Sequence, residues 1–293
     1  MKIQNIILIV VLSMSVASVT AWFMGNKTRR DVDATPVIQK SAFDRVMETN
    51  TLRCGYAIAS PWFMTDPNTR EHSGVGYEVT NAVAAKIGLK VEWVEETDWG
   101  LAEQGLIAHR YDMLCGSVCI DPRRARAATY STPFLHIPVL ATVRADDSRF
   151  DGSLKNLNDS QVKIGVKNGH VFEFIANEQY PRAQKIYANS LSDDTEFLQM
   201  LKFNKIDVAF AGQTTIDLYN EKNPDAKVRS LGEPVRFCNG AFMLPLGDGR
   251  LKTVVDNAIG ELNSSGQIQD ILNRFVKDDP RYVLAPAKLF RDK

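Results

Sequence analysis

The sequence has no excess of either charge, because 35 lysine and arginine residues balance 35 aspartate and glutamate residues. A neutral chain of ordinary apolar content gives no reason to expect disorder or a nucleic-acid partner. No Gly-x-Ser-x-Gly, His-Glu-x-x-His or P-loop motif is present, so the sequence does not indicate a serine hydrolase, a zinc protease or a P-loop nucleotidase. Internal repeats and low-complexity runs are missing too. The 293 residues suffice for one large domain or two moderate ones.

The sequence contains few cysteines, and their number, four, is even. The complete set is Cys54, Cys115, Cys119 and Cys238. In an exported chain these residues permit two disulfides in three connectivities, and the alternative is that they are ordinary buried thiols. The Cys-x3-Cys spacing of Cys115 and Cys119 stands without a second pair, which is weak support for zinc. We therefore expect neither a metal ion nor another cofactor.

The N-terminus has the composition of a targeting segment. A short basic start, an apolar core from Ile6 to Leu12 and a Val-x-Ala sequence at residues 19–21 are typical of a secretory signal. If it is not cut, the apolar run is long enough to cross a bilayer. We predict a signal peptide or a membrane anchor over residues 1–24, followed by a polar linker over 25–42. Either outcome places the folded part in the periplasm, secreted or tethered to the inner membrane.

One stretch near the middle of the chain carries the groups of a carboxylate-binding site. The segment Tyr111–Cys115 is apolar and predicts a buried strand. Asp121 followed by proline predicts a helix, because aspartate caps helices and proline suits the first helical position. Ser117 and Cys119 would then lie on the loop before this helix, and Arg124 in its first turn. Small polar groups, backbone N–H groups, a helix N-terminus and a guanidinium would favour a carboxylate there.

This stretch resembles a segment of the family-3 extracellular solute-binding proteins, the periplasmic receptors that supply amino-acid ABC importers. In that family a strand is followed by Gly/Ser-Ser/Met-x-Ser/Thr-x-Thr-x-x-Arg and then by a closing Phe-Ser-x-Pro-Tyr. Ser117 and Cys119 take the two small polar positions, Arg124 takes the arginine, and Tyr130–Phe134 takes the closing motif. Arg123 is a rival for the arginine position. We prefer Arg124 because its spacing to Cys119 and to Tyr130 agrees with the family.

The resemblance extends from Leu52 to Phe275 and implies a fold. It implies an α/β, two-lobed periplasmic-binding-protein fold of type II, in which each lobe is a mostly parallel sheet flanked by helices and two hinge strands join the lobes. Residues 43–143 plus 238–293 would form lobe 1, and residues 144–237 would form lobe 2. The alternation of strand and helix patterns along the chain itself favours parallel sheets with crossover helices.

Ligands in such sheets bind beyond the carboxyl ends of the strands, where we expect Tyr56, Trp99 and Ser117. By resemblance, Trp99 takes the position of the aromatic residue that packs against the ligand, and a core tryptophan is the alternative. Also by resemblance, the backbone around Gly169 and His170 helps to hold the ligand carboxylate. The side chain of His170 is expected to be partly exposed on its loop, rather than a metal ligand or a pH switch.

The sequence departs from the family where a ligand ammonium would bind. Amino-acid receptors usually carry an aspartate after the strand that ends near residue 210, whereas residues 211–213 here are Ala-Gly-Gln, and residues 57–60 contain no acid either. Because an unpaired buried cation is costly, either another acid takes this role or the ligand lacks an ammonium. In the second case Gln213 could contact a neutral polar group. Unranked candidates for the other acid are Glu78, Glu95 and Glu173.

The resemblance implies a protein that captures a small carboxylate-bearing ligand, an amino acid or a derivative, by lobe closure and delivers it to an ABC permease in the inner membrane. We expect a monomer without nucleic acid and without catalytic residues. By resemblance, Cys54 and Cys115 lie on neighbouring strands, and Cys119 and Cys238 lie near the hinge side of the cleft. Two alternatives stay open. They are an enzyme like the cyclohexadienyl dehydratases of this fold, with Glu173 as its acid, and a sensor or assembly module without transport.

Overall fold

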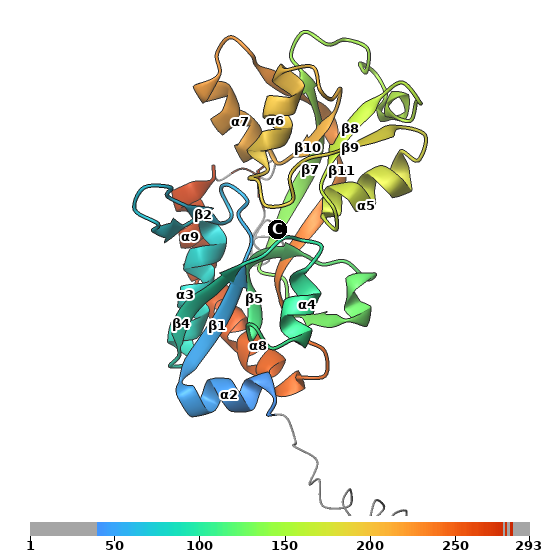
Figure 1. Ribbon diagram of the computed structural model, residues 1–293. Helices are drawn as coiled ribbons and strands as arrows, with labels where there is room; N and C mark the ends of the chain where they lie inside the picture. Colours follow the sequence, from blue (N-terminus) through green and yellow to red (C-terminus); the bar gives the residue numbers. More distant parts are fainter. Residues whose placement is uncertain (1–39, 278, 280–281, 284–293) are drawn as a thin grey trace, which may run out of the picture. The chain divides into compact units, whose positions relative to one another are not determined.

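The computed structural model of this chain describes residues 40–277, 279, 282 and 283 (Figure 1). The signal peptide or anchor expected over residues 1–24 lies outside this part of the chain, as does the expected linker up to residue 39. Within the described part, no helix combines the length and the hydropathy that a membrane crossing requires.

Three parallel strands form the sheet of the first lobe. β1 (Thr51–Tyr56) pairs on one side with β4 (Lys90–Glu96) and on the other with β5 (Met113–Cys119). Parallel strands need long crossover connections, and α3 (Val75–Lys86) and α4 (Ala102–Ile107) lie in these connections. The other elements of this lobe are α2 (Ala42–Thr49), the hairpin of β2 (Met64–Thr65) and β3 (His72–Ser73), α8 (Gly249–Ser264) and α9 (Gln267–Phe275) (Figure 1).

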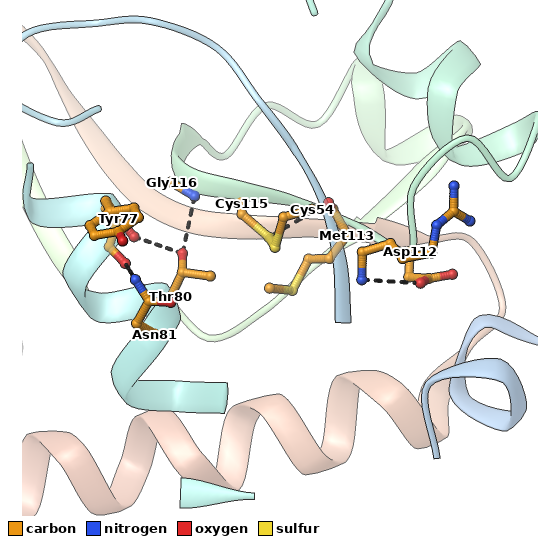
Figure 2. The surroundings of a disulfide bond; sticks show 10 residues. Cys54, Tyr77, Thr80, Asn81, Asp112, Met113, Cys115 and Gly116 are labelled. Carbon is orange, nitrogen blue, oxygen red and sulfur yellow. Dashed lines mark hydrogen bonds between the residues drawn. A yellow bond between two sulfur atoms is a disulfide. The ribbon is translucent and has the colours of Figure 1, made fainter. Parts of the chain in front are cut away.

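A disulfide between Cys54 of β1 and Cys115 of β5 fixes two strands of this sheet (Figure 2). The Cα atoms of the two cysteines are 5.5 Å apart, an ordinary separation for a disulfide. On α3, the hydroxyl of Thr80 accepts a hydrogen bond from the Gly116 N–H at 3.3 Å. A Cβ atom on Gly76 would lie 2.5 Å from the Cα of Gly116, so only glycine permits this close approach of helix and strand. The middle of β5 therefore packs closely against α3.

The second lobe has a parallel sheet of its own. β8 (Lys163–Val166) pairs with β9 (Gln184–Tyr187), and a parallel bridge joins Ile164 to Val208, next to β10 (Ala209–Ala211). The remaining elements of this lobe are the 3-10 turn η2 (Leu154–Leu157) and the helices α5 (Val171–Gln179), α6 (Thr195–Lys202) and α7 (Gln213–Lys222) (Figure 1).

Two long strands connect the lobes. β7 (Leu135–Arg144) and β11 (Val228–Pro245) are paired with each other in antiparallel orientation. β11 also pairs with β5 and with the short strand β6 (Ala128–Tyr130) of the first lobe, whereas β7 pairs with β10 of the second. The largest sheet therefore has the order β10-β7-β11-β5-β1-β4, with β6 beside β11. This arrangement confirms the expected α/β fold with two joining strands.

The structure corrects the expectation that Ser117 and Cys119 lie on a loop. Strand β5 continues to Cys119, so both residues belong to the strand. The reason is the neighbouring strand β11, whose Gly240 pairs with Cys119 and extends the ladder.

The expected helix at Asp121 is also wrong. A single 3-10 turn, η1 (Arg124–Arg126), follows Asp121, and the chain then enters β6. The carboxylate of Asp121 accepts hydrogen bonds from the backbone N–H of Arg123 at 2.9 Å and from its Nε at 2.8 Å, which closes a tight turn. Residues 128–130 then form β6, because they pair with β11 instead of continuing as a helix. The segment after Asp121 consequently contributes no α-helix N-terminus to the site around Arg124.

Candidate ligand-binding site

A cavity of about 60 Å³ is lined by residues of both lobes and of the strands that join them. This volume has room for a few water-sized groups, since each needs about 10–15 Å³ on this measure. Most of the wall is apolar, with a few polar side chains, which is the usual character of a small-molecule site. The first lobe contributes Trp62, Trp99, Ser117 and Arg124, the second lobe contributes His170, Phe172, Phe174 and Asp194, and the joining strands contribute Ile137, Val139 and Cys238.

The wall of the cavity contains a second disulfide, which joins Cys119 of β5 to Cys238 of β11. Ser117 lies two residues before Cys119, and alternate residues of a strand share a face. The hydroxyl of Ser117 is buried and has no hydrogen-bond partner among the described residues. A Cβ atom on Gly240 would lie 2.5 Å from this hydroxyl, so the glycine leaves the oxygen room. A buried hydroxyl without a partner costs about 1–3 kcal/mol, which a ligand that bonds to it would recover.

Arg124 reaches the cavity wall but is already partly engaged. Its Nε and Nη2 donate to the carboxylate of Glu103 on α4, and Nη2 also donates to the backbone carbonyl of Trp99. The two side chains are largely buried, with 9% and 15% of their surface exposed. Nη1 has no hydrogen-bond partner among the described residues. Glu103 thus orients the guanidinium so that Nη1 is the group left for a ligand.

Trp99 and His170 bring the two lobes together at the cavity. Their rings meet edge to face, with centroids 5.2 Å apart. His170 caps α5, where its Nδ1 accepts a hydrogen bond from the Phe172 N–H at 3.3 Å, so the neutral ring carries its proton on Nε2. Burial lowers the pKa of His170 to about 4. The expectation of a partly exposed His170 is therefore wrong, because the ring is packed between the lobes.

Asp194 supplies an acid that the sequence pattern did not identify as a site residue. It lines the cavity from the second lobe, and its Oδ1 accepts a hydrogen bond from Lys167 Nζ at 2.9 Å. Lys167 is completely buried and also donates to the carbonyl of Ser192. The other carboxylate oxygen of Asp194 lies 3.7 Å from His170 Nε2. The pair Asp193-Asp194 has the sequence pattern of a helix start before α6, and no local signal separates that role from a place in the cavity.

Of the sequence-predicted site residues, Trp99, Ser117, Cys119, Arg124 and His170 all line the cavity. The other three are not part of its wall. Tyr56 stacks on Phe63 with ring centroids 4.8 Å apart, inside an aromatic cluster of the first lobe. Gln213 begins α7, where its amide donates to Asp217 at 2.8 Å. Gly169 lies at the edge, where its backbone contacts Gly100 and Trp99.

The three glutamates named as possible ammonium partners have other contacts. Glu78 pairs with Arg274, and Glu95 pairs with Arg110 at 3.0 Å. Glu173 accepts hydrogen bonds from the Gly169 N–H and the Tyr187 hydroxyl, both at 2.7 Å. None of the three lines the cavity. The acids in the wall are Asp121 and Asp194.

Direct contacts hold the two lobes together at the rim. The backbone N–H and the hydroxyl of Ser60 donate to Asp193 at 2.9 and 2.7 Å. The guanidinium of Arg123 lies 4.0 Å above the ring of Phe174. Burial alone would raise the pKa of Asp193, but the hydrogen bonds from Ser60 and Thr195 outweigh it and lower the pKa. Among the described residues, no three histidine, cysteine or acidic side chains converge as a metal site would require.

Known proteins resemble this chain in sequence and in fold. A probable amino-acid ABC transporter-binding protein of Haemophilus influenzae is 22% identical over 228 residues, which are 78% of this chain and 85% of that protein. The crystal structure of the cysteine-binding protein from Campylobacter jejuni superposes with a TM-score of 0.72 at 17% identity, over 84% of this chain and 100% of that one.

A second solved structure is that of the ancestral amino acid-binding protein AncCDT-1, described as a precursor of cyclohexadienyl dehydratase. It superposes with a TM-score of 0.70 at 23% identity, over 81% of this chain and 100% of that one. These structures share the type II fold of periplasmic binding proteins with this chain. The family model of the bacterial extracellular solute-binding proteins, family 3, matches residues 52–278, which is more than half of the sequence. The chain therefore belongs to the bacterial extracellular solute-binding proteins of family 3.

Proposed function

We propose that this protein captures a small carboxylate-bearing solute, an amino acid or a derivative, in the cavity and delivers it to the permease of an ABC importer. Lobe 1 (residues 43–143 plus 238–293) and lobe 2 (residues 144–237) close around the solute by bending in β7 and β11. The bound solute stabilises the closed arrangement because it contacts both lobes only there. The relative from Haemophilus influenzae, named as a probable amino-acid ABC transporter-binding protein, supports this role.

The observation that carries the proposal is a pair of unused donors, both from residues of the first lobe. Nη1 of Arg124 and the hydroxyl of Ser117 both belong to residues of the wall, and neither has a partner among the described residues. A carboxylate offers two oxygens that accept hydrogen bonds from both groups, and charge-assisted bonds of this kind are the strong ones. The ring of Trp99 provides an apolar surface beside them.

The ligand ammonium would bind to an acid of the second lobe. Asp194 comes from the second lobe and Arg124 from the first, and both line the same space. Asp194 is therefore our candidate for the acid that is missing from residues 211–213. Oδ2 of Asp194 accepts no hydrogen bond from the described residues, whereas both carboxylate oxygens of Asp121 accept bonds from Arg123.

The contacts of Glu173 favour binding over the enzyme alternative. An acid that protonates a leaving group must reach the substrate. Glu173 instead bonds to the Gly169 N–H and to the Tyr187 hydroxyl and is not part of the cavity wall. We therefore assign no catalytic role to Glu173.

A thermal-shift screen of amino acids and organic acids tests the proposal. A solute at a hundred times its dissociation constant raises the free energy of unfolding by about 2.7 kcal/mol, so a genuine ligand gives a clear shift. Calorimetry on each hit should then show one site per chain. The proposal fails if no carboxylate-bearing solute binds, and turnover of prephenate or arogenate would support the enzyme alternative instead.

A further inference from the structure

We infer that the cavity selects amino acids of zero net charge with an apolar side chain, and that Glu103 and Lys167 set this preference. This inference rests on the proposed function, since it names the class of solute for the same cavity. It is carried by the charge balance of the wall.

Each charged side chain of the cavity wall has an opposite charge of the protein against it. Arg124 is paired with Glu103, and Asp121 is paired with Arg123 at 2.6 Å. Asp194 is paired with Lys167 at 2.9 Å. The remaining titratable group of the wall is His170, whose burial lowers its pKa to about 4 and keeps it neutral at pH 7. The wall and its immediate partners therefore have no net charge.

The pairs around Arg124 and Asp194 are too buried for solvent to replace them. The side chain of Lys167 is 0% exposed and that of Asp194 is 15% exposed. Charges in such places interact strongly, because water screens them little. A ligand ammonium beside Asp194 also meets the field of Lys167, and a ligand carboxylate beside Arg124 also meets the field of Glu103. The cavity can thus hold one charge of each sign, but an extra charge of either sign has no counterpart.

An extra charge on the ligand would be expensive. Burying an ion without a partner costs several kcal/mol in real proteins, even after relaxation and water penetration. The guanidinium of arginine, the ammonium of lysine and the second carboxylate of glutamate are such charges. The rest of the wall offers apolar surface instead, from Trp62, Val139 and Phe172 among others. A zwitterion with an aliphatic or thioether side chain fits both the zero net charge of the wall and its apolar surface.

Matched ligand pairs test the inference by calorimetry on the full chain. Glutamine and glutamate have the same size, and methionine and lysine have nearly the same size. Each pair therefore isolates the effect of a charge on the ligand side chain. We expect valine, leucine or methionine to bind best, and the neutral member of each pair to bind at least about thirtyfold more tightly, which corresponds to about 2 kcal/mol. If arginine, lysine or glutamate binds within about tenfold of the best apolar amino acid, the inference is wrong and the proposed function still stands. If no amino acid or other carboxylate binds, both are wrong.

Glu103→Gln tests the role of the internal acid. Removing its charge leaves Arg124 without a counter-charge, so the affinity for glutamate should rise at least about tenfold relative to glutamine. Glu92→Gln is the matched control. It removes the same charge from an exposed residue of β4 that is not part of the cavity wall. Lys167→Met is the complementary variant and should shift the preference toward lysine. Urea unfolding of each variant confirms that it folds, and an unchanged glutamate-to-glutamine ratio in Glu103→Gln contradicts the assignment.

Discussion

The backbone of Gly100 in the first lobe lies directly against Gly169 in the second. A Cβ atom on Gly169 would lie 2.7 Å from the Cα of Gly100 and 2.9 Å from its nitrogen, closer than real side chains approach. Gly169 also has a φ of 70°, in the left-handed region that glycine adopts most easily. The missing side chain at Gly169 therefore lets the two loops meet at the edge of the cavity.

Replacing this glycine should impair closure in addition to stability. In Gly169→Ala we expect the affinity for the solute to fall at least about tenfold, because the methyl group keeps the two loops apart. Gly152→Ala is the control, since Gly152 also has a positive φ of 87° but a Cβ atom there meets nothing within 4 Å. Both variants should lose about 1–2 kcal/mol of unfolding free energy from the strained backbone. Equal affinities of the two variants in calorimetry would refute the role of the contact.

Removal of the guanidinium should weaken the capture of the carboxylate. Losing one partner of a buried charged hydrogen bond costs about 2–5 kcal/mol, so Arg124→Gln should raise the dissociation constant at least roughly thirtyfold. Arg126→Gln is the control, because Arg126 is exposed in the same 3-10 turn. Unfolding in urea must be measured alongside, since Glu103 loses its partner. An unchanged dissociation constant in Arg124→Gln would show that the carboxylate binds elsewhere.

Acid should destabilise the folded protein through His170. Burial lowers its pKa from 6.5 to about 4, so between these values the unfolded chain binds a proton that the folded protein does not. Stability contributed by the neutral ring is therefore complete above pH 6.5 and falls as the pH drops toward 4, by about 3 kcal/mol in total. Protonation would also place a cation beside Lys167 and Arg124, with Asp194 as its one acidic neighbour in the cavity wall.

His170→Asn isolates this effect, because asparagine caps a helix well and does not titrate. Urea unfolding from pH 7 to pH 4 should show a shallower loss of stability in the variant than in the natural protein. Parallel pH profiles of the two proteins would mean that His170 does not titrate as its burial requires.

The hydrogen bonds between Ser60 and Asp193 should stabilise the closed lobes. Asp193→Asn removes the carboxylate charge and replaces one accepting oxygen by a donating amide, so the bonds from Ser60 to Oδ2 and from the Thr195 N–H to Oδ1 cannot all persist at full strength. We expect the dissociation constant to rise by a factor of about 5 to 150, for a loss of about 1–3 kcal/mol. Asp159→Asn is the control, since Asp159 caps only an exposed local turn. A normal affinity in Asp193→Asn would show that this contact does not contribute to closure.

The two disulfides should differ in their effect on the affinity for the solute. Replacing Cys119 and Cys238 by serine opens a loop with a sequence separation of 119 residues, and replacing Cys54 and Cys115 opens one of 61 residues. Each double variant should lose about 2–5 kcal/mol of unfolding free energy. Only the variant without the Cys119–Cys238 disulfide should also change the affinity for the solute, because these two cysteines line the cavity. Equal effects of both variants on affinity would contradict this distinction.

Much of the fold could be predicted because its signals are local. The apolar segment Tyr111–Cys115 predicts a buried strand, and β5 begins within it, at Met113. The alternation of strand and helix patterns predicts parallel sheets with crossover helices, as β1, β4 and β5 form with α3 and α4. The predicted helix at Asp121 failed because its cap signal competes with the pairing of β6 to β11, which involves residues more than 100 positions away. A capping signal is worth about 1 kcal/mol and does not outweigh a strand in a sheet.

Within the site, the sequence by itself determined which chemical groups are present and that a guanidinium, a small hydroxyl and an aromatic ring lie at or just after the carboxyl ends of neighbouring strands. Strand and helix patterns bring Ser117, Arg124 and Trp99 to one edge because parallel strands end at the same edge of a sheet. Only the tertiary structure decided that Glu103 holds Arg124, that Asp194 faces the cavity and that Lys167 balances it. These pairings join side chains from separate elements, and their energies depend on burial, which no local pattern of residues encodes.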